Sequence, residues 1–326
     1  MKKMIFVTGG AGFIGSNLCE KLVDLGHQVV CYDNLSTGNY ENIRHLLANK
    51  NFKLVVADIR DVESLSSAME GCTHVSHQAA LGSVPRSISN PSATNENNIA
   101  GSLNVLHTAM QIGIKRFVYA SSSSVYGNSS VSPKKEGEEG EVMSPYAVTK
   151  QTLEKYAKVY KEIHGMETIG LRYFNVFGPK QSPSGAYAAV IPIFINKALL
   201  GEPIPINGTG EQTRDFTYIE NVVDANVKSL FSAKPESFGK NFNIACAEYC
   251  SVVELANKIK NTISAVSPKH HCKLELMHNP ERVGDVRDSL ADLGLSTQLL
   301  GYMPLVLMDA GLESTIRWFL KVLDEG

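Results

Sequence analysis

The sequence predicts an α/β protein with a doubly wound parallel Rossmann sheet and a smaller C-terminal α/β domain. Two observations lead to this fold class. In the first half of the chain, short β-rich runs alternate with amphipathic helical segments, which is typical of a parallel sheet covered by helices on both faces. The glycine cluster "TGGAGFIGS" follows the first of these runs directly, where nucleotide-binding sheets carry their phosphate loop.

The individual elements follow from this alternation. We expect strands at 4–7, 28–32, 53–56, 74–77, 116–120 and 168–172, and helices at 16–25, 62–69, 99–112 and 145–164. After "NVFGP" the alternation ends, and Pro, Gly and Ser cluster through "GPKQSPSGAY". We therefore expect a cofactor-binding domain at 1–179 and a substrate domain at 180–326. The run "FNIA" at 242–245 is expected to return to the first sheet as a late strand.

Composition excludes several classes of protein. The chain has 326 residues, 43% of them hydrophobic and 20% charged, with a net charge of −2, so it is long enough for a substantial core. Nucleic-acid and membrane-surface partners need clustered basic charge, and none occurs. The apolar run after "MKKM" is too short for a signal peptide, and no stretch reaches transmembrane length.

The six cysteines have no disulfide-framework spacing, so we expect a reduced, cytoplasmic protein. Cys246 and Cys250, followed later by His270, His271 and Cys272, do not have the spacing of a standard zinc site. We expect no metal.

The glycine cluster predicts a dinucleotide site. Gly9, Gly12 and Gly15 lie between a strand and a helix, which permits a tight turn, close approach of a pyrophosphate and close helix packing. The pyrophosphate would lie at the helix N-terminus, where free N–H groups favour an anion. Asp33 ends the second strand, where a carboxylate can accept hydrogen bonds from ribose hydroxyls and would repel a 2′-phosphate. The expected cofactor is NAD.

The motif "SPYAVTK" predicts an acid–base pair. Tyr146 and Lys150 lie one turn apart on a single helix face, and Ser144 and Pro145 are suited to the N-cap and N1 positions. A neighbouring ammonium, the positive helix end and an oxidised nicotinamide would each lower the tyrosine pKa, making it a usable base. The hydroxyls of "YASSSSVYG" lie at the end of an expected strand, where parallel sheets bind ligands.

With these motifs the chain resembles the extended short-chain dehydrogenase/reductase superfamily, and within it bacterial UDP-N-acetylglucosamine 4-epimerases. The resemblance covers the whole chain through "TGGAGFIGS", "YDNLSTGN", "HQAALGSVPRSI", "NNIAGSLNVL", "SPYAVTK", "RYFNVFGP", "GAYAAVIP", "RDFTYI" and "RVGDVRDSLAD". It implies that Ser122 bonds the sugar O4, that Tyr146 moves the O4 proton, and that Lys150 holds the nicotinamide ribose.

The resemblance also implies binding residues. Those expected to bind the cofactor, besides Tyr146 and Lys150, are Gly9, Gly12, Phe13, Ile14, Asp33, Asn34, Ser36, Thr37, Gly38, Asp58, Ile59, Gln78 and Ala80. Those expected to bind a UDP-sugar substrate are Gly82, Ser83, Ser122, Ser123, Ser124, Asn175, Arg214, Arg282 and Ser289. Of these, Asn175, Arg214 and Arg282 would hold the UDP diphosphate, because amide and guanidinium donors suit phosphate oxygens.

The resemblance narrows the reaction. Dehydratases of this superfamily carry Asp-Glu where this chain has Ser123 and Ser124, and decarboxylases carry Glu at the position of Ser124. Epimerisation needs neither carboxylate, and it is the activity we expect. Gly82 stands where hexose epimerases often have lysine, and Ser289 where some have tyrosine. The smaller side chains leave room for an acetamido group, which favours interconversion of UDP-GlcNAc and UDP-GalNAc.

Other hypotheses stay open. UDP-glucose or UDP-glucuronate could be the epimerised substrate, since Arg86 could meet a carboxylate. A net NAD-dependent oxidoreductase would need freely exchanging NAD, and a binding protein would not need Ser122, Tyr146 and Lys150. The resemblance further implies a homodimer formed through two helices per subunit, which would include 99–112 and 145–164.

Overall fold

The computed structural model describes residues 2–184, 188–268, 275–280 and 288–325. Its centre is a seven-stranded sheet in the order β11-β6-β5-β4-β1-β2-β3, in which every neighbouring pair is parallel. The expected Rossmann topology is confirmed, since the strand order reverses between β1 and β4. The strands are β1 Met4–Thr8, β2 Gln28–Asp33, β3 Phe52–Val56, β4 His74–His77, β5 Arg116–Ser122, β6 Glu167–Tyr173 and β11 Lys240–Ile244.

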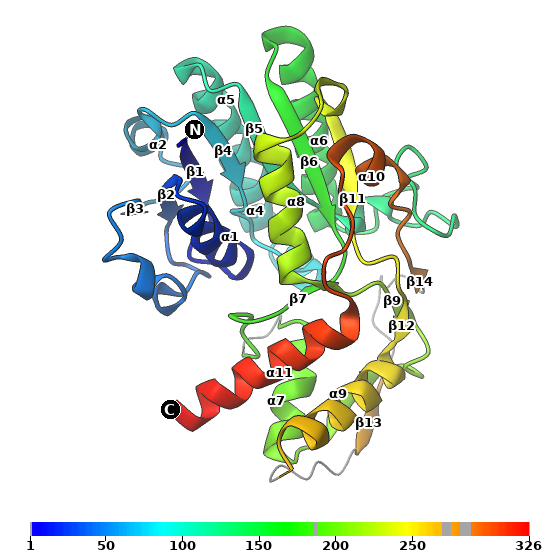
Figure 1. Ribbon diagram of the computed structural model, residues 1–326. Coiled ribbons are helices and arrows are strands. Elements are labelled where there is room, and N and C mark those ends of the chain that lie inside the picture. Colours follow the sequence, from blue (N-terminus) through cyan, green and yellow to red (C-terminus); the bar gives the residue numbers. More distant parts are fainter. Residues whose placement is uncertain (1, 185–187, 269–274, 281–287, 326) are drawn as a thin grey trace.

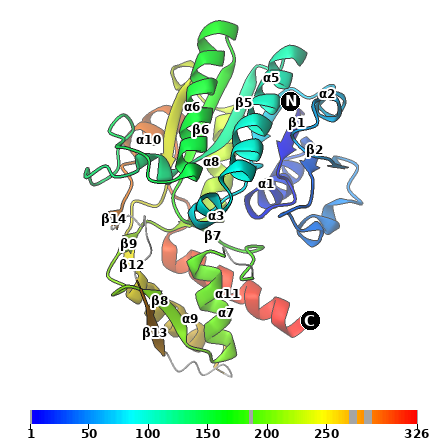
Figure 2. The same ribbon diagram turned by 180° about the vertical axis from the view of Figure 1, so that it is seen from behind.

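Helices cover both faces of this sheet because its strands are apolar on both faces. In β1, Ile5 and Val7 belong to one core cluster and Phe6 belongs to the other, as the two-residue period of a strand requires. Helices α1 (Phe13–Asp24) and α8 (Ile219–Phe231) pack on the first face (Figure 1). The second face carries α2 (Val62–Met69), α5 (Ser102–Ile112) and α6 (Pro145–His164) (Figure 2).

A smaller layer lies below the sheet in Figure 1 and is built mainly from the last third of the chain. Its longer helices are α7 Val190–Leu200, α9 Val252–Val266 and α11 Met308–Glu325. Short strands pair between them: β8 Ile204–Asn207 with β13 Leu276–Asn279, β9 Thr213–Arg214 with both β12 Cys250–Ser251 and β14 Asp288–Ser289, and β7 Val176–Phe177 with β10 Thr217–Tyr218. The core is continuous between the two layers, since one cluster holds Ile5, Phe194 and Leu312.

The remaining elements are short. They are the helices α3 Val84–Ser89, α4 Pro91–Asn95 and α10 Gly294–Leu300, the π-helix η3 Glu96–Gly101, and the 3₁₀ turns η1 Tyr40–Asn42, η2 Arg44–Leu46, η4 Ser123–Tyr126 and η5 Pro235–Ser237. Among the described residues, no helix has the length and apolar character needed to cross a bilayer.

The ends of the expected elements are confirmed to within three residues. The helix expected at 99–112 begins as α5 only at Ser102, because residues Glu96–Gly101 form a π-helical turn. Asn98 in this turn is buried and bonds the backbone of Leu81 with both ends of its amide: Oδ1 accepts from the N–H at 2.7 Å and Nδ2 donates to the carbonyl at 3.1 Å. The turn therefore holds the segment that follows β4 in place.

Candidate active site

The glycine loop between β1 and α1 leaves room for a ligand and none for side chains. Gly9 has φ +65°, and a Cβ there would lie 2.7 Å from the Ala79 nitrogen. A Cβ on Gly15 would lie 2.1 Å from the Gly9 carbonyl oxygen, so the helix packs directly on the loop. Gly12 is the N-cap of α1, and no side chain caps the helix. Its first N–H groups are therefore available to an anion.

Asp33 is held in one orientation at the end of β2. Its Oδ2 accepts a hydrogen bond from the Ala11 N–H at 2.9 Å, and its Oδ1 accepts one from the Leu35 N–H at 2.8 Å. Gly38 packs against this carboxylate, since a Cβ there would lie 2.8 and 2.9 Å from its two oxygens. Each carboxylate oxygen keeps a second lone pair for a further donor.

A cavity of about 330 Å³ opens between the glycine loop, the end of β2 and the segment after β4. The expected cofactor residues that line it are Gly9, Gly12, Phe13, Ile14, Asp33, Asn34, Ser36, Thr37, Ile59, Gln78 and Ala80. Gly38 does not line the cavity, because it lies against the carboxylate of Asp33. Lining residues that the sequence did not indicate include Tyr32, Ala57, Leu81 and Asn97.

Asp58 lies outside the lining of this cavity and bonds other protein groups. Its carboxylate accepts two hydrogen bonds from the Arg60 guanidinium and one from Asn34 Nδ2, at 2.8 to 2.9 Å. Hydrogen bonds from Arg60 hold the pKa of Asp58 well below its ordinary value. Asp58 therefore orients Asn34, which does line the cavity.

Gln78 is held by two buried polar side chains, Asn226 on α8 and Tyr173 on β6. Its Nε2 donates to Asn226 Oδ1 at 3.0 Å, and its Oε1 accepts from Tyr173 OH at 3.1 Å. Asn226 Nδ2 in turn donates to the same tyrosine oxygen at 2.9 Å. Asn226 lies on α8 and gave no recognisable pattern in the sequence, since a single amide on an amphipathic helix is usual.

Ser122, Tyr146 and Lys150 meet at the carboxyl end of β5. Ser144 caps α6, with its Oγ accepting from the Ala147 N–H at 3.2 Å, and Pro145 follows at N1, so the expected helix start is confirmed. Tyr146 lies in the first turn, with the Ser122 side chain close enough to lower the pKa of its phenol. Lys150 Nζ lies 5.8 Å from the centre of the Tyr146 ring and donates to the Ala120 carbonyl at 2.8 Å.

The protonation of this pair differs from what the sequence led us to expect. Burial raises the pKa of Tyr146 above its ordinary value, and the Ser122 side chain opposes this only in part. Burial also lowers the pKa of Lys150 to about 8, against the opposing charge of Glu154. The expected lowering of the tyrosine pKa is therefore wrong for the chain alone, because desolvation of the phenolate outweighs the effect of Ser122.

The serines after Ser122 form the turn η4. Ser122 Oγ accepts from the Ser124 N–H at 3.2 Å, which caps the turn, and Ser123 is its first residue. The Ser124 hydroxyl oxygen is buried and has no partner among the residues that the structure describes. It is thus an available polar contact beside Ser122.

A second cavity, of about 340 Å³, lies in the smaller layer. Of the expected substrate residues, Asn175 and Arg214 line it. Asn175 has φ +33° and its Nδ2 donates to the Asp215 carbonyl at 2.9 Å. Ser289 is buried on β14, beside Arg214 in register. The amide side chains of Asn207, Gln212 and Asn279 also line this cavity; the sequence did not indicate them, because polar residues in turns are common.

The other expected substrate positions lie apart from this cavity. Gly82 lines the first cavity, with nothing within 4 Å of a Cβ placed there. Ser83 is the N-cap of α3, with φ 100° and its Oγ accepting from the Arg86 N–H at 3.4 Å. Arg282 lies outside the described residues, as do His270, His271 and Cys272.

Comparison with known proteins gives consistent results. A family model, "NAD dependent epimerase/dehydratase family", matches residues 5–245. A putative UDP-glucose 4-epimerase of Methanocaldococcus jannaschii is 36% identical over 317 residues, which cover 97% of this chain and 98% of that protein.

Two solved structures are similar over almost the full length. UDP-N-acetylglucosamine 4-epimerase from Methanobrevibacter ruminantium M1, in complex with UDP-N-acetylmuramic acid, has a TM-score of 0.89 and 36% identity, over 99% of this chain and 100% of that chain. UDP-glucuronic acid 4-epimerase from Bacillus cereus, in complex with UDP-glucuronic acid and NAD, has a TM-score of 0.88 and 30% identity, over 98% of this chain and 99% of that chain.

Proposed function

The chain belongs to the NAD-dependent epimerase/dehydratase family, with NAD as its cofactor, and from this premise we propose that it interconverts UDP-N-acetylglucosamine and UDP-N-acetylgalactosamine. The observation that carries the proposal is the meeting of Ser122, Tyr146 and Lys150 at the end of β5. Strand β5 lies between β4 and β6. The segment after β4 lines the first cavity, and the segment after β6 lines the second.

The residues of the first cavity fit NAD. The glycine backbone excludes any Cβ at positions 9 and 15, which is the space a pyrophosphate needs. The oriented carboxylate of Asp33 suits two ribose hydroxyls and disfavours a 2′-phosphate. Bound NAD supplies the acceptor, and then the donor, for the hydride on carbon 4 of the sugar.

The reacting hydroxyl is assigned to Tyr146 and Ser122. Tyr146 takes the proton from the sugar O4 while C4 is oxidised, and it returns a proton to O4 when the ketone is reduced on its other face. Ser122 donates a hydrogen bond to O4 and orients it. The positive charge of Lys150 favours the phenolate against the burial that raises its pKa.

The absence of carboxylates beside Ser122 supports epimerisation over elimination. Positions 123 and 124 are both serine, and neither hydroxyl can act as the acid and base that dehydration requires. The 4-keto sugar therefore has no catalysed path except return of the hydride. Asn175 and Arg214 are proposed to hold the UDP diphosphate in the second cavity, which makes 180–326 the substrate domain.

Small side chains support the N-acetylated substrate. Gly82 has open space beside it, and Ser289 offers a short hydroxyl beside Arg214. The similar structure from Methanobrevibacter ruminantium is named as a UDP-N-acetylglucosamine 4-epimerase, which agrees with this reading. The similar Methanocaldococcus jannaschii protein is named as a putative UDP-glucose 4-epimerase and the similar Bacillus cereus enzyme is named for UDP-glucuronic acid, so these two sugars are the competing substrates.

A homodimer formed through α5 and α6 belongs to the same proposal. Helix α6 exposes Val148, Val159 and Ile163, the last of them 70% exposed, and a second copy would cover this apolar stripe. Light scattering that gives the mass of one chain, with no concentration dependence, would contradict it.

The test is incubation of the purified protein with UDP-N-acetylglucosamine, without added cofactor, followed by separation of the UDP-sugars. We expect UDP-N-acetylgalactosamine to form with no accumulation of NADH, and a Tyr146→Phe variant to form none. NADH that builds up only after NAD is added would identify a net dehydrogenase. Conversion of UDP-glucose or UDP-glucuronate alone would keep the mechanism and overturn the assigned sugar.

A further inference from the structure

A buried carboxylate on α6 bonds side chains of the strands β5 and β6. Glu154 lies one turn after Lys150, and its side chain is 7% exposed. Its Oε1 and Oε2 accept hydrogen bonds from Arg172 Nε and Nη2 at 2.9 and 2.8 Å. This is the forked geometry that gives the strongest ion pairs. Arg172 belongs to β6 and its side chain is 5% exposed.

The same carboxylate also contacts β5. Ser121 Oγ donates to Glu154 Oε1 at 2.5 Å, and Ser121 immediately precedes Ser122. One side chain therefore connects the helix that carries Tyr146 and Lys150 to the strand that carries Ser122. These three residues depend on the relative position of α6 and β5, because Tyr146 and Ser122 must stay within hydrogen-bond reach.

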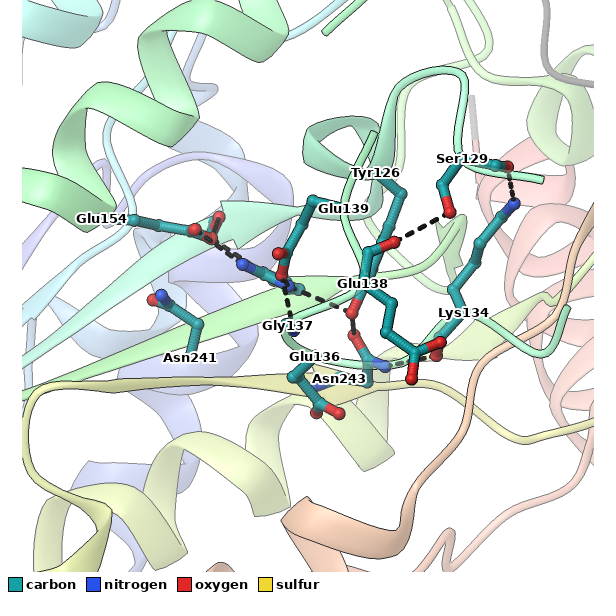
Figure 3. A network of polar contacts seen from close by, with 12 residues as sticks. Tyr126, Ser129, Lys134, Glu136, Gly137, Glu138, Glu139, Glu154, Asn241 and Asn243 are labelled. Carbon is teal, nitrogen blue, oxygen red and sulfur yellow. Dashed lines mark hydrogen bonds and ion pairs between the residues drawn. The ribbon is translucent and has the colours of Figure 1, made fainter. Parts of the chain in front are cut away.

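On its other side, Arg172 continues into a larger polar network. Its Nη1 donates to Tyr126 OH at 3.1 Å and pairs with Glu139, which lies in the loop after β5. Tyr126 donates in turn to Asn243 Oδ1 on β11 at 2.7 Å. Figure 3 shows Glu154 at one end of this network, with Glu139 and Tyr126 beyond it. Arg172 thus has two carboxylate partners, and only one of them is on the catalytic helix.

The charge of Glu154 also raises the pKa of Lys150, against the lowering that burial causes. Burial lowers the pKa of Lys150 to about 8, and the charge of Glu154 acts in the other direction. The other titratable groups around this pair are Tyr146 on α6, His77 on β4 and Tyr119 on β5. Burial lowers the pKa of His77 to about 3 and raises that of Tyr119, so both are neutral at pH 7. Glu154 is therefore the carboxylate that favours the ammonium form.

We propose that Glu154 is a positioning residue for the reaction, which keeps Lys150 charged and, through Ser121, holds α6 in place against the strand end that carries Ser122. The inference rests on the proposed function, because that function gives Tyr146 and Lys150 their roles. Glu154 does not contact the substrate; it acts through its two neighbours.

The chain offers a matched pair of variants. Glu154→Gln and Glu139→Gln each replace one carboxylate partner of Arg172 by an amide of the same size, so each removes one negative charge from the same cluster. Only the first of these carboxylates contacts Ser121 and acts on Lys150. If Glu154 only stabilised the ion pair with Arg172, both variants would change the titration and the turnover to the same extent.

The first readout is the titration of Lys150 itself, followed by NMR of the lysine Cε carbons in the NAD-loaded protein, with Lys150→Met used to assign its signal. We expect the midpoint of Lys150 to fall by about one pH unit in Glu154→Gln, because the negative charge that opposes its desolvation is lost. The midpoint in Glu139→Gln should stay at that of the parent. Equal shifts in the two variants, or none in either, would overturn the proposal.

The second readout is steady-state turnover of the UDP-sugar. Glu154→Gln should lower kcat about tenfold with KM nearly unchanged, because Glu154 is absent from the lining of the cavity that holds Asn175 and Arg214. A rise in KM with an unchanged kcat would contradict the assignment. If the parent turns over no UDP-sugar, the proposed function fails, and the titration still decides the role of Glu154.

A double variant covers the case in which Glu154→Gln does not fold. Replacing one member of a buried pair leaves an uncompensated charge, whereas replacing both by apolar residues of similar size is often neutral or stabilising. Glu154→Met/Arg172→Met therefore removes the charge beside Lys150 without an orphaned guanidinium. We expect the same fall of the Lys150 midpoint in this variant; an unchanged midpoint would overturn the inference.

Discussion

Arg214 and Ser289 are register partners on the adjacent parallel strands β9 and β14. Arg214 lines the second cavity, while Ser289 is buried one strand away. In the proposed function, these two neighbouring positions contact a phosphate and the sugar. The size of the side chain at 289 is then expected to change which sugar fits without removing the proposed diphosphate contact.

The first prediction concerns this position. Ser289→Tyr should lower the rate with UDP-N-acetylglucosamine relative to UDP-glucose by at least about tenfold, the usual scale of discrimination by pocket volume. The loss follows from filling the space assigned to the acetamido group. Competing-substrate assays measure the ratio, and Ser289→Thr, which keeps the hydroxyl, is the control. An unchanged ratio in the tyrosine variant would refute the pocket assignment.

The second prediction concerns the support of Asp33. In Gly38→Ala the new Cβ would lie 2.8 Å from a carboxylate oxygen, so Asp33 must move and its contacts with the ribose should weaken. We expect NAD affinity to fall about tenfold or more, equal to the loss of one hydrogen bond to a charged group. Calorimetry on cofactor-stripped protein measures it.

Gly26→Ala provides the control for this experiment. Gly26 has φ +82° and nothing within 4 Å of its Cβ position, so alanine strains the backbone far from the cofactor cavity. It should lower the melting temperature and leave the affinity for NAD unchanged. If Gly38→Ala behaves in the same way, the link between Gly38, Asp33 and NAD is wrong.

The fold was largely predictable because the strands and helices of the first half have strong periodicity and clear ends. Ser144 and Pro145 fixed the start of α6, and β4 was expected at its observed residues, 74–77. The π-helical turn was not predictable, because it depends on the contact of Asn98 with Leu81, 17 residues away. A local pattern contains no information on such a contact.

Site residues that belong to one short motif were predictable from the sequence. Site residues that come together only because distant strands pair were not. Asn207 and Asn279 reach one cavity because β8 and β13 pair in register. Ion pairs such as that of Glu154 with Arg172 join two elements that are each ordinary in sequence. The raised pKa of Tyr146 also needed the structure, because burial decides it.

The third prediction concerns Asp215, a fully buried carboxyl that accepts hydrogen bonds from the N–H groups of Cys246 and Ala291 at 3.0 and 3.2 Å. Burial raises its pKa from 3.8 to about 7, with these backbone bonds opposing. The folded state therefore binds a proton that the unfolded state has lost, and the parent loses stability as pH rises from about 4 to 7.

An Asp215→Asn variant does not titrate and should lack this loss. Its free energy of unfolding relative to the parent should increase by about 2–3 kcal/mol between pH 5 and pH 8. Denaturant unfolding at both pH values measures the change, and using the difference cancels the titration of all other groups. A constant difference would mean that Asp215 is ionised in the folded protein throughout this range.

The fourth prediction concerns Lys150, whose burial as an ammonium lowers the free energy of unfolding. Burial lowers the pKa of Lys150 from 10.5 to about 8, so between these values the unfolded state binds the proton that the folded state has released. Stability attributable to this group therefore rises with pH from 8 to 10.5 and is lowest below pH 8.

Lys150→Met should stabilise the protein at pH 7 by up to about 3 kcal/mol and abolish turnover. Lys155→Met, an exposed substitution on the same helix, should do neither. A Lys150→Met variant less stable than the parent at pH 7 would show that the ammonium is well solvated or paired in the folded state, and that burial does not oppose its charge.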